Sequence, residues 1–143
     1  MNIKVPVRPV TLDAEGFHFF IDAVLNSMQI NMLVDTGASK TVFDINRINR
    51  YLPKRKKTFK LFDNLSTGLG TNTMKSYFIR VNRFCISELE LQNYDAVLLD
   101  MKHVNKSYKI LKLQAIDGVL GSDFLMKYKA VIDLKKMILK LNV

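Results

Sequence analysis

The sequence predicts a single, mostly β domain with two or three short helices. Short runs rich in Val, Ile, Phe and Thr recur between turn residues, which is typical of strands. The 143 residues fit one domain, and a hydrophobic content of 48% with 24% charged residues is enough to bury a core. The chain has no linker, repeat or low-complexity segment, so we treat residues 1–143 as one domain.

The first half of the chain carries the clearest strand signals. Residues 1–10 alternate apolar and polar side chains, and two longer runs flank an Asn-Ser turn that predicts a hairpin. Asp44 offers an N-cap for a short helix, which has to end before Pro53. We expect strands at 1–10, Phe17–Leu25, Met28–Val34 and 40–43.

The second half alternates further strands with two short helices. Two apolar runs surround a centre rich in Gly, Ser and Asn within residues 61–79, and this pattern predicts a long hairpin. Ser122 and Asp123 offer caps for a short helix. We expect strands at Ser76–Ile86, Leu89–Leu99, 130–134 and 137–143, an apolar run at 115–120, and helices at 103–113 and 124–128.

The charge of the chain limits its classes of partner. The sequence has 22 Lys+Arg against 13 Asp+Glu, and this net charge of +9 attracts nucleic acid or acidic groups. A basic cluster lies between Arg47 and Lys60, but such runs are more often solvated surfaces, so we do not expect a nucleic-acid partner. No stretch reaches the roughly 18 apolar residues of a membrane span, so we expect no membrane association.

The remaining reactive side chains indicate structural roles. Cys85 is the single cysteine, which excludes an internal disulfide and a cysteine-based zinc site. A lone thiol is typical of a reducing compartment, so we expect a cytoplasmic protein, with no cofactor or metal. His18 and His103 have no ligand partner nearby in the sequence. Asp117 and Asp133 are expected to be turn or surface groups.

The segment that carries chemistry is residues 33–39. It places Asp35 at the end of an apolar strand, directly before Thr36 and Gly37. Burying a carboxylate there is costly unless the charge has a function. The Thr36 hydroxyl can lock a loop, and Gly37 permits backbone conformations closed to other residues. The triplet can therefore hold a carboxylate rigidly, although an Asp-Thr-Gly triplet alone is equally compatible with a strand-ending turn.

A second pattern, at residues 116–125, combines an apolar pair, Gly121 and a short helix. A strand ending in Asp-Thr-Gly-Ala, a glycine-containing hairpin, and two hydrophobic residues followed by Gly and a helix together resemble the retropepsin-like aspartic proteases. The resemblance spans nearly the whole chain. Residues 118–125 running into 130–136 look most like the protease domain of DNA-damage-inducible ubiquitin-shuttle proteins and their bacterial single-domain relatives. This resemblance implies a closed single lobe with a flap hairpin.

The resemblance also implies roles for individual residues. Asp35 would be the catalytic aspartate, Thr36 the hydroxyl that interlocks across a dimer, and Gly37 the turn that exposes the carboxylate. Gly121 would pack beneath this loop, and the hairpin at 61–79 would be a flap that covers a bound peptide. The peptide-binding residues would be Ala38, Ser66, Thr67, Gly68, Leu69, Gly70 and Thr71.

The mechanism of this family needs two carboxylates, one acting as a base toward water and one as an acid toward the peptide carbonyl. This chain has one Asp-Thr-Gly triplet, so the resemblance predicts a homodimer in which each protomer supplies Asp35. The implied activity is hydrolysis of peptide bonds by an activated water. The alternative is a catalytically inactive, dimeric peptide-binding module of the same fold.

Two positions depart from the retroviral pattern. Retroviral members usually carry an ion pair that supports the dimer where this chain has Ser39 and Ser122. Losing both partners leaves no orphaned charge, but it removes that anchor. We therefore expect the C-terminal strand at 138–143 to supply much of the dimer interface.

Overall fold

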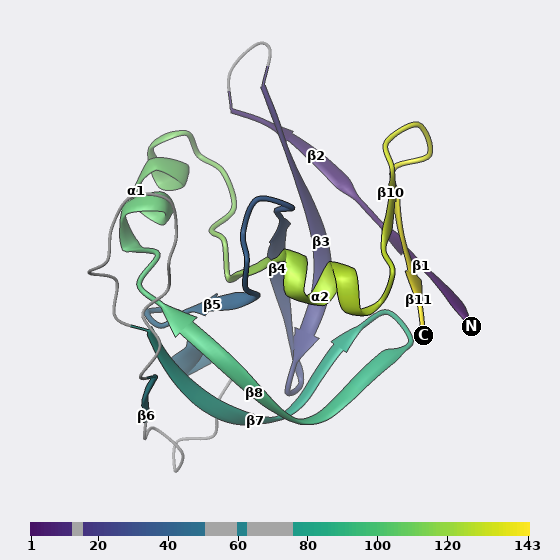
Figure 1. The fold of residues 1–143 in the computed structure, drawn as a ribbon. Helices are drawn as coiled ribbons and strands as arrows, with labels where there is room; N and C mark the ends of the chain where they lie inside the picture. Colours follow the sequence, from purple (N-terminus) through teal and green to yellow (C-terminus); the bar gives the residue numbers. More distant parts are fainter. Residues whose placement is uncertain (13–15, 51–59, 63–75) are drawn as a thin grey trace.

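The structure is a computed structural model that describes residues 1–12, 16–50, 60–62 and 76–143 (Figure 1). The strands are β1 (Asn2–Pro6), β2 (Arg8–Thr11), β3 (Phe17–Leu25), β4 (Met28–Val34), β5 (Val42–Asp44), β6 (Lys60–Phe62), β7 (Ser76–Ile86), β8 (Leu89–Leu99), β9 (Gly118–Leu120), β10 (Val131–Asp133) and β11 (Ile138–Asn142). The helices are α1 (Lys102–Ile110), α2 (Ser122–Lys127) and a 3₁₀ helix at Ile48–Arg50. The fold is mostly β with a few short helices, as the sequence predicts. None of the described helices is long and apolar enough to cross a membrane.

Six strands close into a barrel. The larger sheet has the order β2-β3-β4-β9-β5-β8-β7-β6. β3 also pairs with β7, with Val24 opposite Cys85 and Leu25 opposite Phe84, and this contact joins the two ends of the run from β3 to β7. β4 with β9 and β5 with β8 pair in parallel, while the long hairpin of β7 and β8 sweeps across the lower side of the molecule in Figure 1. The closed lobe that the resemblance implies is confirmed.

The two ends of the chain pair in a separate three-stranded sheet of order β1-β11-β10 (Figure 1). β11 lies in the middle and pairs antiparallel with both neighbours; Asn2 of β1, for example, lies opposite Asn142. The terminal amine of Met1 donates to the carbonyl oxygen of Val143 at 2.8 Å. Both backbone edges of β11 are therefore paired within the chain, and β1 and β10 are the outer strands of this sheet.

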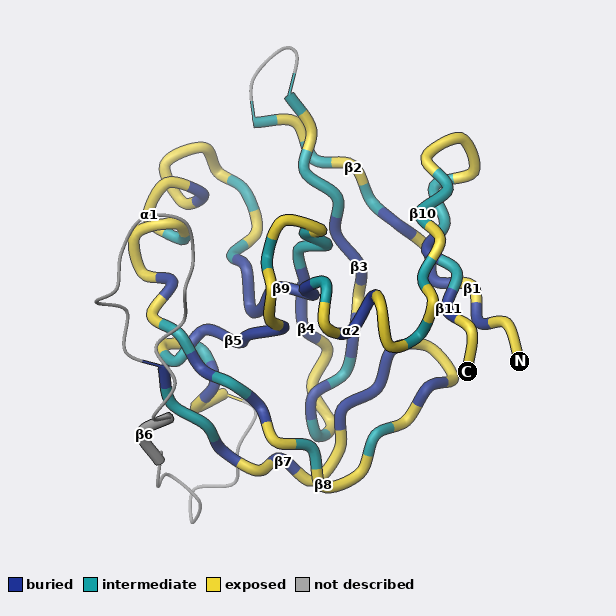
Figure 2. The backbone as a smooth tube through the Cα atoms, viewed as in Figure 1, coloured by how far each residue is buried: buried dark blue, intermediate teal, exposed yellow. Residues whose placement is uncertain are grey.

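The core lies inside the barrel and under the terminal sheet (Figure 2). β1 and β11 alternate buried and more exposed residues, with Ile3, Val5, Leu139 and Leu141 facing the core. This is the period-two pattern of a half-buried strand. Phe124 of α2 joins the same cluster, so the terminal sheet and α2 are held to the barrel by shared apolar contacts.

An aromatic cluster connects β5, β7 and β8 within this core. Phe43 meets Phe84 edge to face with ring centroids 5.3 Å apart, and Tyr94 lies 5.0 Å from Phe84. Burial raises the pKa of Tyr94 to about 12, so its hydroxyl stays protonated at any ordinary pH. The cluster therefore packs as neutral rings that fix three strands against each other.

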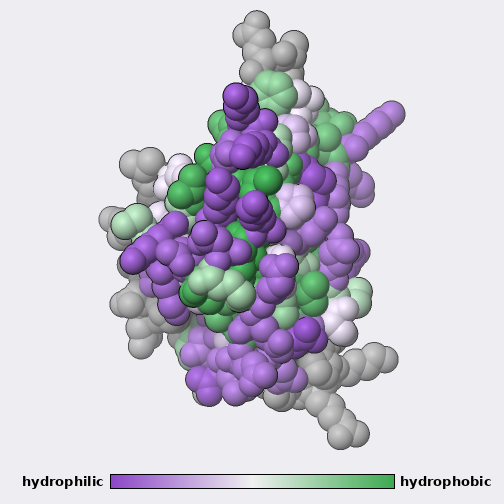
Figure 3. Space-filling view, turned by 90° about the vertical axis from the view of Figure 1, so that its right-hand side faces the viewer, coloured by the Kyte–Doolittle hydropathy of each residue, from purple (hydrophilic) through white to green (hydrophobic). Residues whose placement is uncertain are grey.

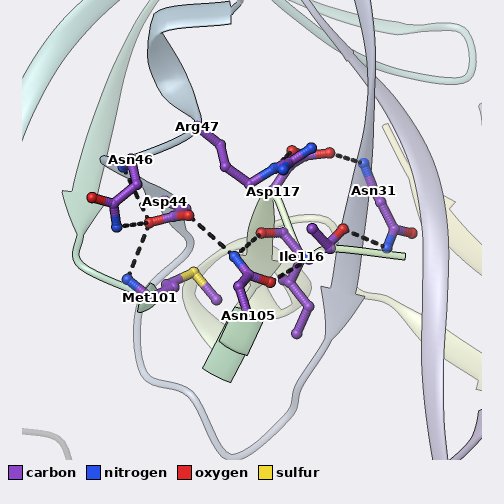
Figure 4. A network of polar contacts seen from close by, with 9 residues as sticks. Asn31, Asp44, Asn46, Arg47, Met101, Asn105, Ile116 and Asp117 are labelled. Carbon is purple, nitrogen blue, oxygen red and sulfur yellow. Dashed lines mark hydrogen bonds and ion pairs between the residues drawn. The ribbon is translucent and has the colours of Figure 1, made fainter. Parts of the chain in front are cut away.

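A buried polar network begins at Asp117, immediately before β9 (Figure 4). Its carboxylate accepts a hydrogen bond from the Asn31 N–H of β4 at 2.8 Å and pairs with Nε of Arg47 at 2.5 Å. The backbone of Asp117 adds two further bonds: its N–H donates to Asn31, and its carbonyl oxygen accepts from the N–H of Asp44. Asp117 thus joins β4 and β5 on either side of β9.

Asp44, the last residue of β5, forms the second half of the network (Figure 4). Its carboxylate accepts hydrogen bonds from the N–H of Met101 at 3.1 Å and from the amide of Asn105 at 3.1 Å. The side chain of Asn105 also bonds to both backbone polar groups of Ile116. The network therefore ties α1 to β5 and to the segment that leads into β9.

The sequence predicts the strands better than these polar groups. The strands predicted at Phe17–Leu25, Met28–Val34, Ser76–Ile86 and Leu89–Leu99 are confirmed at both ends. The expectation that Asp117 is a turn or surface group is wrong, because the residue is 4% exposed and ion-paired. Asp44 ends a strand and does not begin an α-helix; a 3₁₀ helix follows at Ile48–Arg50. Its carboxylate accepts bonds from Asn46 and also from Met101 and Asn105 at the start of α1.

We expect Asp117→Ala to lower the free energy of unfolding by about 3 kcal/mol or more. The substitution removes the ion pair with Arg47 and the acceptor of the Asn31 N–H in a buried site. Chemical denaturation of the two proteins measures the difference. Asp95→Ala is the matched control, because its ion pair with Arg80 is exposed; equal losses in the two variants would contradict the assigned role of the network.

Candidate active site

The loop that carries Asp35 begins where β4 ends. β4 runs parallel to β9 with Val34 opposite Leu120, and the N–H of Asp35 donates to the carbonyl oxygen of Leu120 at 3.0 Å. The N–H of Gly37 then donates to Oδ1 of Asp35 at 2.9 Å, and the N–H of Ala38 to the carbonyl oxygen of Asp35 at 3.2 Å. A tight turn therefore orients the half-buried carboxylate from its own backbone.

Gly37 lies close to the Asp35 carboxylate in this turn. A Cβ at this position would lie 3.2 Å from Oδ1 of Asp35, tighter than most Cβ contacts. The backbone of Gly37 does not adopt the left-handed conformation that favours glycine. From the sequence, the glycine is attributed to an unusual backbone conformation. The structure instead favours the close approach of the Asp35 side chain as the reason for a glycine at this position.

Gly121 lies directly beneath the Asp35 loop, as the resemblance implies. A Cβ on Gly121 would lie 2.5 Å from the carbonyl carbon of Lys40 and 2.9 Å from the carbonyl oxygen of Ala38. The following N–H, of Ser122, donates to the Ala38 oxygen at 2.7 Å. Any side chain at Gly121 would therefore push the loop away from the turn between β9 and α2.

A side-chain clamp between Thr41 and Asp123 secures the far end of the loop. Oδ1 of Asp123 accepts hydrogen bonds from the N–H of Thr41 at 2.9 Å and from its hydroxyl at 2.8 Å. The same hydroxyl accepts from the N–H of Gly121 at 3.0 Å. The N-cap of α2 is Gly121, so the sequence assigns Asp123 to a helix cap too simply: its carboxylate mainly binds the Asp35 loop.

A cavity of about 460 Å³ opens beside Asp35. Asp35 and Thr36 supply its polar wall, and the rest is largely apolar. At its rim, Phe17 of β3 and Leu134, just after β10, are each about half exposed. The other lining residues are Val7, His18, Phe19, Leu33, Val34, Ile132 and Leu139. A carboxylate at the wall of an apolar hollow is an arrangement that can bind and act on an apolar segment.

One polar pair includes His18 of the cavity wall. Nδ1 of His18 lies 2.6 Å from the hydroxyl of Tyr108 in α1. Burial raises the pKa of Tyr108, so the hydroxyl stays protonated. It can donate a hydrogen bond to Nδ1 in the tautomer where that nitrogen carries no proton. The pair gives His18 the structural role that the sequence assigns to it, and it fixes α1 against β3.

The structure brings some of the predicted site residues together. Asp35, Thr36, Gly37 and Ala38 form one loop at the cavity. The predicted peptide-binding residues at 66–71 lie outside the described residues. β6 pairs antiparallel with the start of β7, with Phe62 opposite Ser76, so the described part includes the base of a hairpin in the predicted position.

Sequence reasoning missed two groups of site residues. Thr41 and Asp123 are 82 positions apart. The apolar cavity wall comes from five separate segments of the chain, so neither group has a local signal in the sequence. Among the described residues, no group of three or more His, Cys, Asp or Glu side chains could hold a metal ion. Asp35 is the one carboxylate among the described residues that line the cavity.

Comparisons with known proteins agree with this geometry. The family model described as aspartyl protease matches residues 21–124, and the chain therefore belongs to the aspartyl protease family. This match covers the Asp35 loop and Gly121. A search of curated proteins gave no match.

Three solved structures share the fold. A retropepsin-like aspartic protease from Rickettsia conorii is 21% identical with a TM-score of 0.60, over 99% of this chain and 90% of that one. EIAV protease in complex with an inhibitor is 20% identical with a TM-score of 0.57, over 87% and 100%. The retroviral protease-like domain of Ddi1 from Leishmania major is 14% identical with a TM-score of 0.51, over 85% and 86%. The retropepsin-like fold is confirmed, including the predicted likeness to both bacterial and Ddi1-type domains.

We expect Thr41→Val to lower the free energy of unfolding by about 1–3 kcal/mol. The substitution keeps the shape but removes the acceptor of the buried Gly121 N–H and one bond to Asp123. Thermal or chemical denaturation measures the loss. Thr11→Val, at an exposed position of β2, is the matched control, and a Thr41 variant as stable as this control would contradict the clamp.

Proposed function

We propose that this protein is an aspartic endopeptidase whose active site is assembled from two copies of the chain. Membership of the aspartyl protease family and the retropepsin-like fold support a protease in general terms. The observation that carries the finer proposal is the position of Asp35. Its carboxylate is held by the loop at the wall of an apolar cavity, in a chain with one Asp-Thr-Gly triplet.

The proposed reaction uses the Asp35 carboxylates of both protomers. Two adjacent like charges resist double ionisation, so the pair shares one proton. The unprotonated carboxylate takes a proton from a water, which attacks the peptide carbonyl carbon, while the protonated carboxyl gives its proton to the carbonyl oxygen. Collapse of the resulting tetrahedral species, with a proton passed to the amide nitrogen, breaks the peptide bond. No covalent intermediate forms.

The proposed dimer places the two Asp35 loops face to face across a twofold axis. Thr36 and Gly37 are exposed at the outer side of the loop, where the partner's loop has to approach. The Thr36 hydroxyl is then available to bond across the interface. The apolar rim at Phe17 and Leu134 adjoins the same loop and supplies surface that association can bury.

Truncation of the C-terminal strand would not test its part in the proposed dimer interface. β11 is already paired on both sides, and Leu141 is fully buried, so removing residues 141–143 would damage the core of the protomer. A partner could extend this sheet only at β1 or β10. Figure 3, which faces the side of the molecule where the terminal sheet lies, shows apolar side chains exposed among hydrophilic ones. Val131 of β10 is one of the exposed apolar residues and is a better site for an interface mutation.

The proposed substrate is an extended peptide segment with apolar side chains. The cavity beside Asp35 is mainly apolar and is large enough for a bulky side chain. We propose that residues 66–71, with Ala38, contact the bound peptide as the flap and floor of the site. We place the activity in the cytoplasm, because the lone and buried Cys85 suits a reducing compartment.

We expect Asp35→Asn to reduce peptide cleavage at least about a hundredfold while the protein stays folded and dimeric. The amide keeps the shape but cannot take a proton from water. Cleavage of a diverse peptide mixture between about pH 3 and 8, followed by mass spectrometry, measures the loss. Asp95→Asn, an exposed carboxylate elsewhere, is the control. A folded, dimeric wild-type protein that cuts nothing would instead indicate a peptide-binding module.

Mixing wild-type and Asp35→Asn protomers tests whether the site is shared. If each active site needs two Asp35 carboxylates, equal amounts of freely exchanging subunits leave about a quarter of the dimers fully active. Specific activity, measured after exchange is complete, should fall to that level. Activity close to half would show that each protomer works alone.

A further inference from the structure

A second cavity, of about 760 Å³, lies between α1 and the segments at 44–47 and 113–115. It is separate from the cavity at Asp35. The wall that faces it from α1 carries Lys102, Lys106 and Lys109, and Lys112 completes the rim. Leu113 and Ala115 supply a small apolar part. Nothing in the proposed proteolytic reaction uses this cavity.

The lysines share one side of the cavity because of helix geometry. Positions i, i+4 and i+7 lie on one face of an α-helix, and these are the positions of Lys102, Lys106 and Lys109. The face spans about 10 Å along the helix axis. The amines therefore form a row and not a single point of positive charge.

The end of α1 adds the fourth lysine. Lys112 has a φ of 58°, a left-handed conformation that non-glycine residues seldom adopt. Its N–H donates to Lys109, and the N–H of Leu113 donates to the carbonyl oxygen of Tyr108. This is the Schellman arrangement that ends many helices. It turns the chain back so that Lys112 and Leu113 both face the cavity.

The floor of the cavity leaves the lysine charges largely uncompensated. The Asp44 carboxylate is buried and is bonded to Asn46, Met101 and Asn105. Arg47 is neutralised by Asp117. Across the described part of the chain, arginines form the side-chain ion pairs, and none of these four lysines takes part in one.

Acidic groups near the rim are few. Asp100 lies beside the start of α1. Its pKa is below the ordinary value, because its carboxylate accepts hydrogen bonds from the Asn46 side chain and the N–H of Lys102 and lies near positive charge. Asp100 is therefore charged, but it is occupied by these two donors. Four lysines thus face Asp44 and Asp100, and the cavity carries an excess of positive charge.

We propose that this lysine-lined cavity, termed the α1 basic cavity, binds an acidic segment of a polypeptide. Carboxylates on alternate residues of an extended chain are about 7 Å apart, close to the roughly 6 Å rise between lysines four positions apart. The segment would lie along α1 with its carboxylates toward the row of amines.

The chemistry of the lining favours carboxylates over phosphates. Compact phosphate groups are commonly held by arginine forks or by clustered backbone N–H groups, and Arg47 is already engaged by Asp117. Bases of single-stranded nucleic acid are bound by stacking on aromatic rings, and the described lining has none. Separate, flexible amines suit separate carboxylates.

Binding at the α1 basic cavity leaves the Asp35 site open. Asp44, in this cavity, bonds through its N–H to Asp117 at the start of β9, whereas the N–H of Asp35 bonds to Leu120 at its end. The two sites are thus separated by the length of β9, about 10 Å. The inference is therefore independent of proteolysis and can be tested in a protein that lacks Asp35.

The test measures direct binding of a fluorescently labelled peptide of alternating Glu and Gly to the full-length Asp35→Asn protein by anisotropy, at about 0.1 M salt. The triple variant Lys102→Gln, Lys106→Gln, Lys109→Gln should bind at least about tenfold more weakly. Lys129→Gln, Lys135→Gln, Lys136→Gln is the matched control, because it removes the same charge from exposed positions elsewhere. Glutamine keeps the helix propensity of lysine, so α1 should remain folded, and circular dichroism checks this.

The outcomes separate the proposal from its alternatives. Retained binding in the control triple variant, with loss in the α1 triple variant, supports it. An equal loss in both would show a response to net charge only, and no binding by the parent protein would also overturn it. Displacement of the peptide by tripolyphosphate or a single-stranded oligonucleotide at far lower concentration than by unlabelled peptide would reassign the cavity to phosphate ligands.

Discussion

The parallel pairing of β4 with β9 is the constraint on which the rest of the structure depends. β9 has only three residues, Gly118–Leu120, so its parallel pairing with β4 is short and makes few hydrogen bonds of its own. Contacts at both ends hold it in register. At one end the buried Asp117 carboxylate binds β4 and Arg47, and at the other the Asp35 N–H binds Leu120 while the loop rests on Gly121. The Asp35 carboxylate is thus positioned by contacts outside its loop as well as by its own triplet.

The two glycines that bracket β9 have one physical explanation. A Cβ on Gly118 would lie 2.8 Å from the carbonyl oxygen of Val42, and a Cβ on Gly121 would lie 2.5 Å from the carbonyl carbon of Lys40. Both contacts are with backbone, which cannot move aside as a side chain can. β5 and the Asp35 loop can approach β9 this closely only because both positions lack a side chain. The Gly-Val-Leu-Gly segment at 118–121 therefore encodes close packing of the backbone around the Asp35 loop.

The sequence predicts those features that have a local cause. β3 and β4 follow from two apolar runs around a turn, and the family resemblance rests on the Asp35 triplet and the segment containing Gly121. The buried carboxylates escape prediction because their partners are distant: Asn31 is 86 positions from Asp117, and Met101 is 57 from Asp44. The local sequence around an aspartate at the end of a strand does not show whether its carboxylate is solvated or accepts a hydrogen bond from a buried amide. Only the closed barrel brings those donors to it.

The single lobe also explains why catalysis in the proposed enzyme depends on the association of two chains. One carboxylate cannot accept a proton from water and at the same time donate one to the carbonyl oxygen, and Asp35 is the one carboxylate among the described residues that line its cavity. In the proposed dimer the second is the Asp35 carboxylate of the partner. The terminal sheet cannot recruit it through β11, whose edges are both occupied within the chain. The proposed contact therefore lies at the loop itself and at the apolar rim formed by Phe17 and Leu134. In this proposal, association buries the rim and completes the pair of carboxylates in the same step.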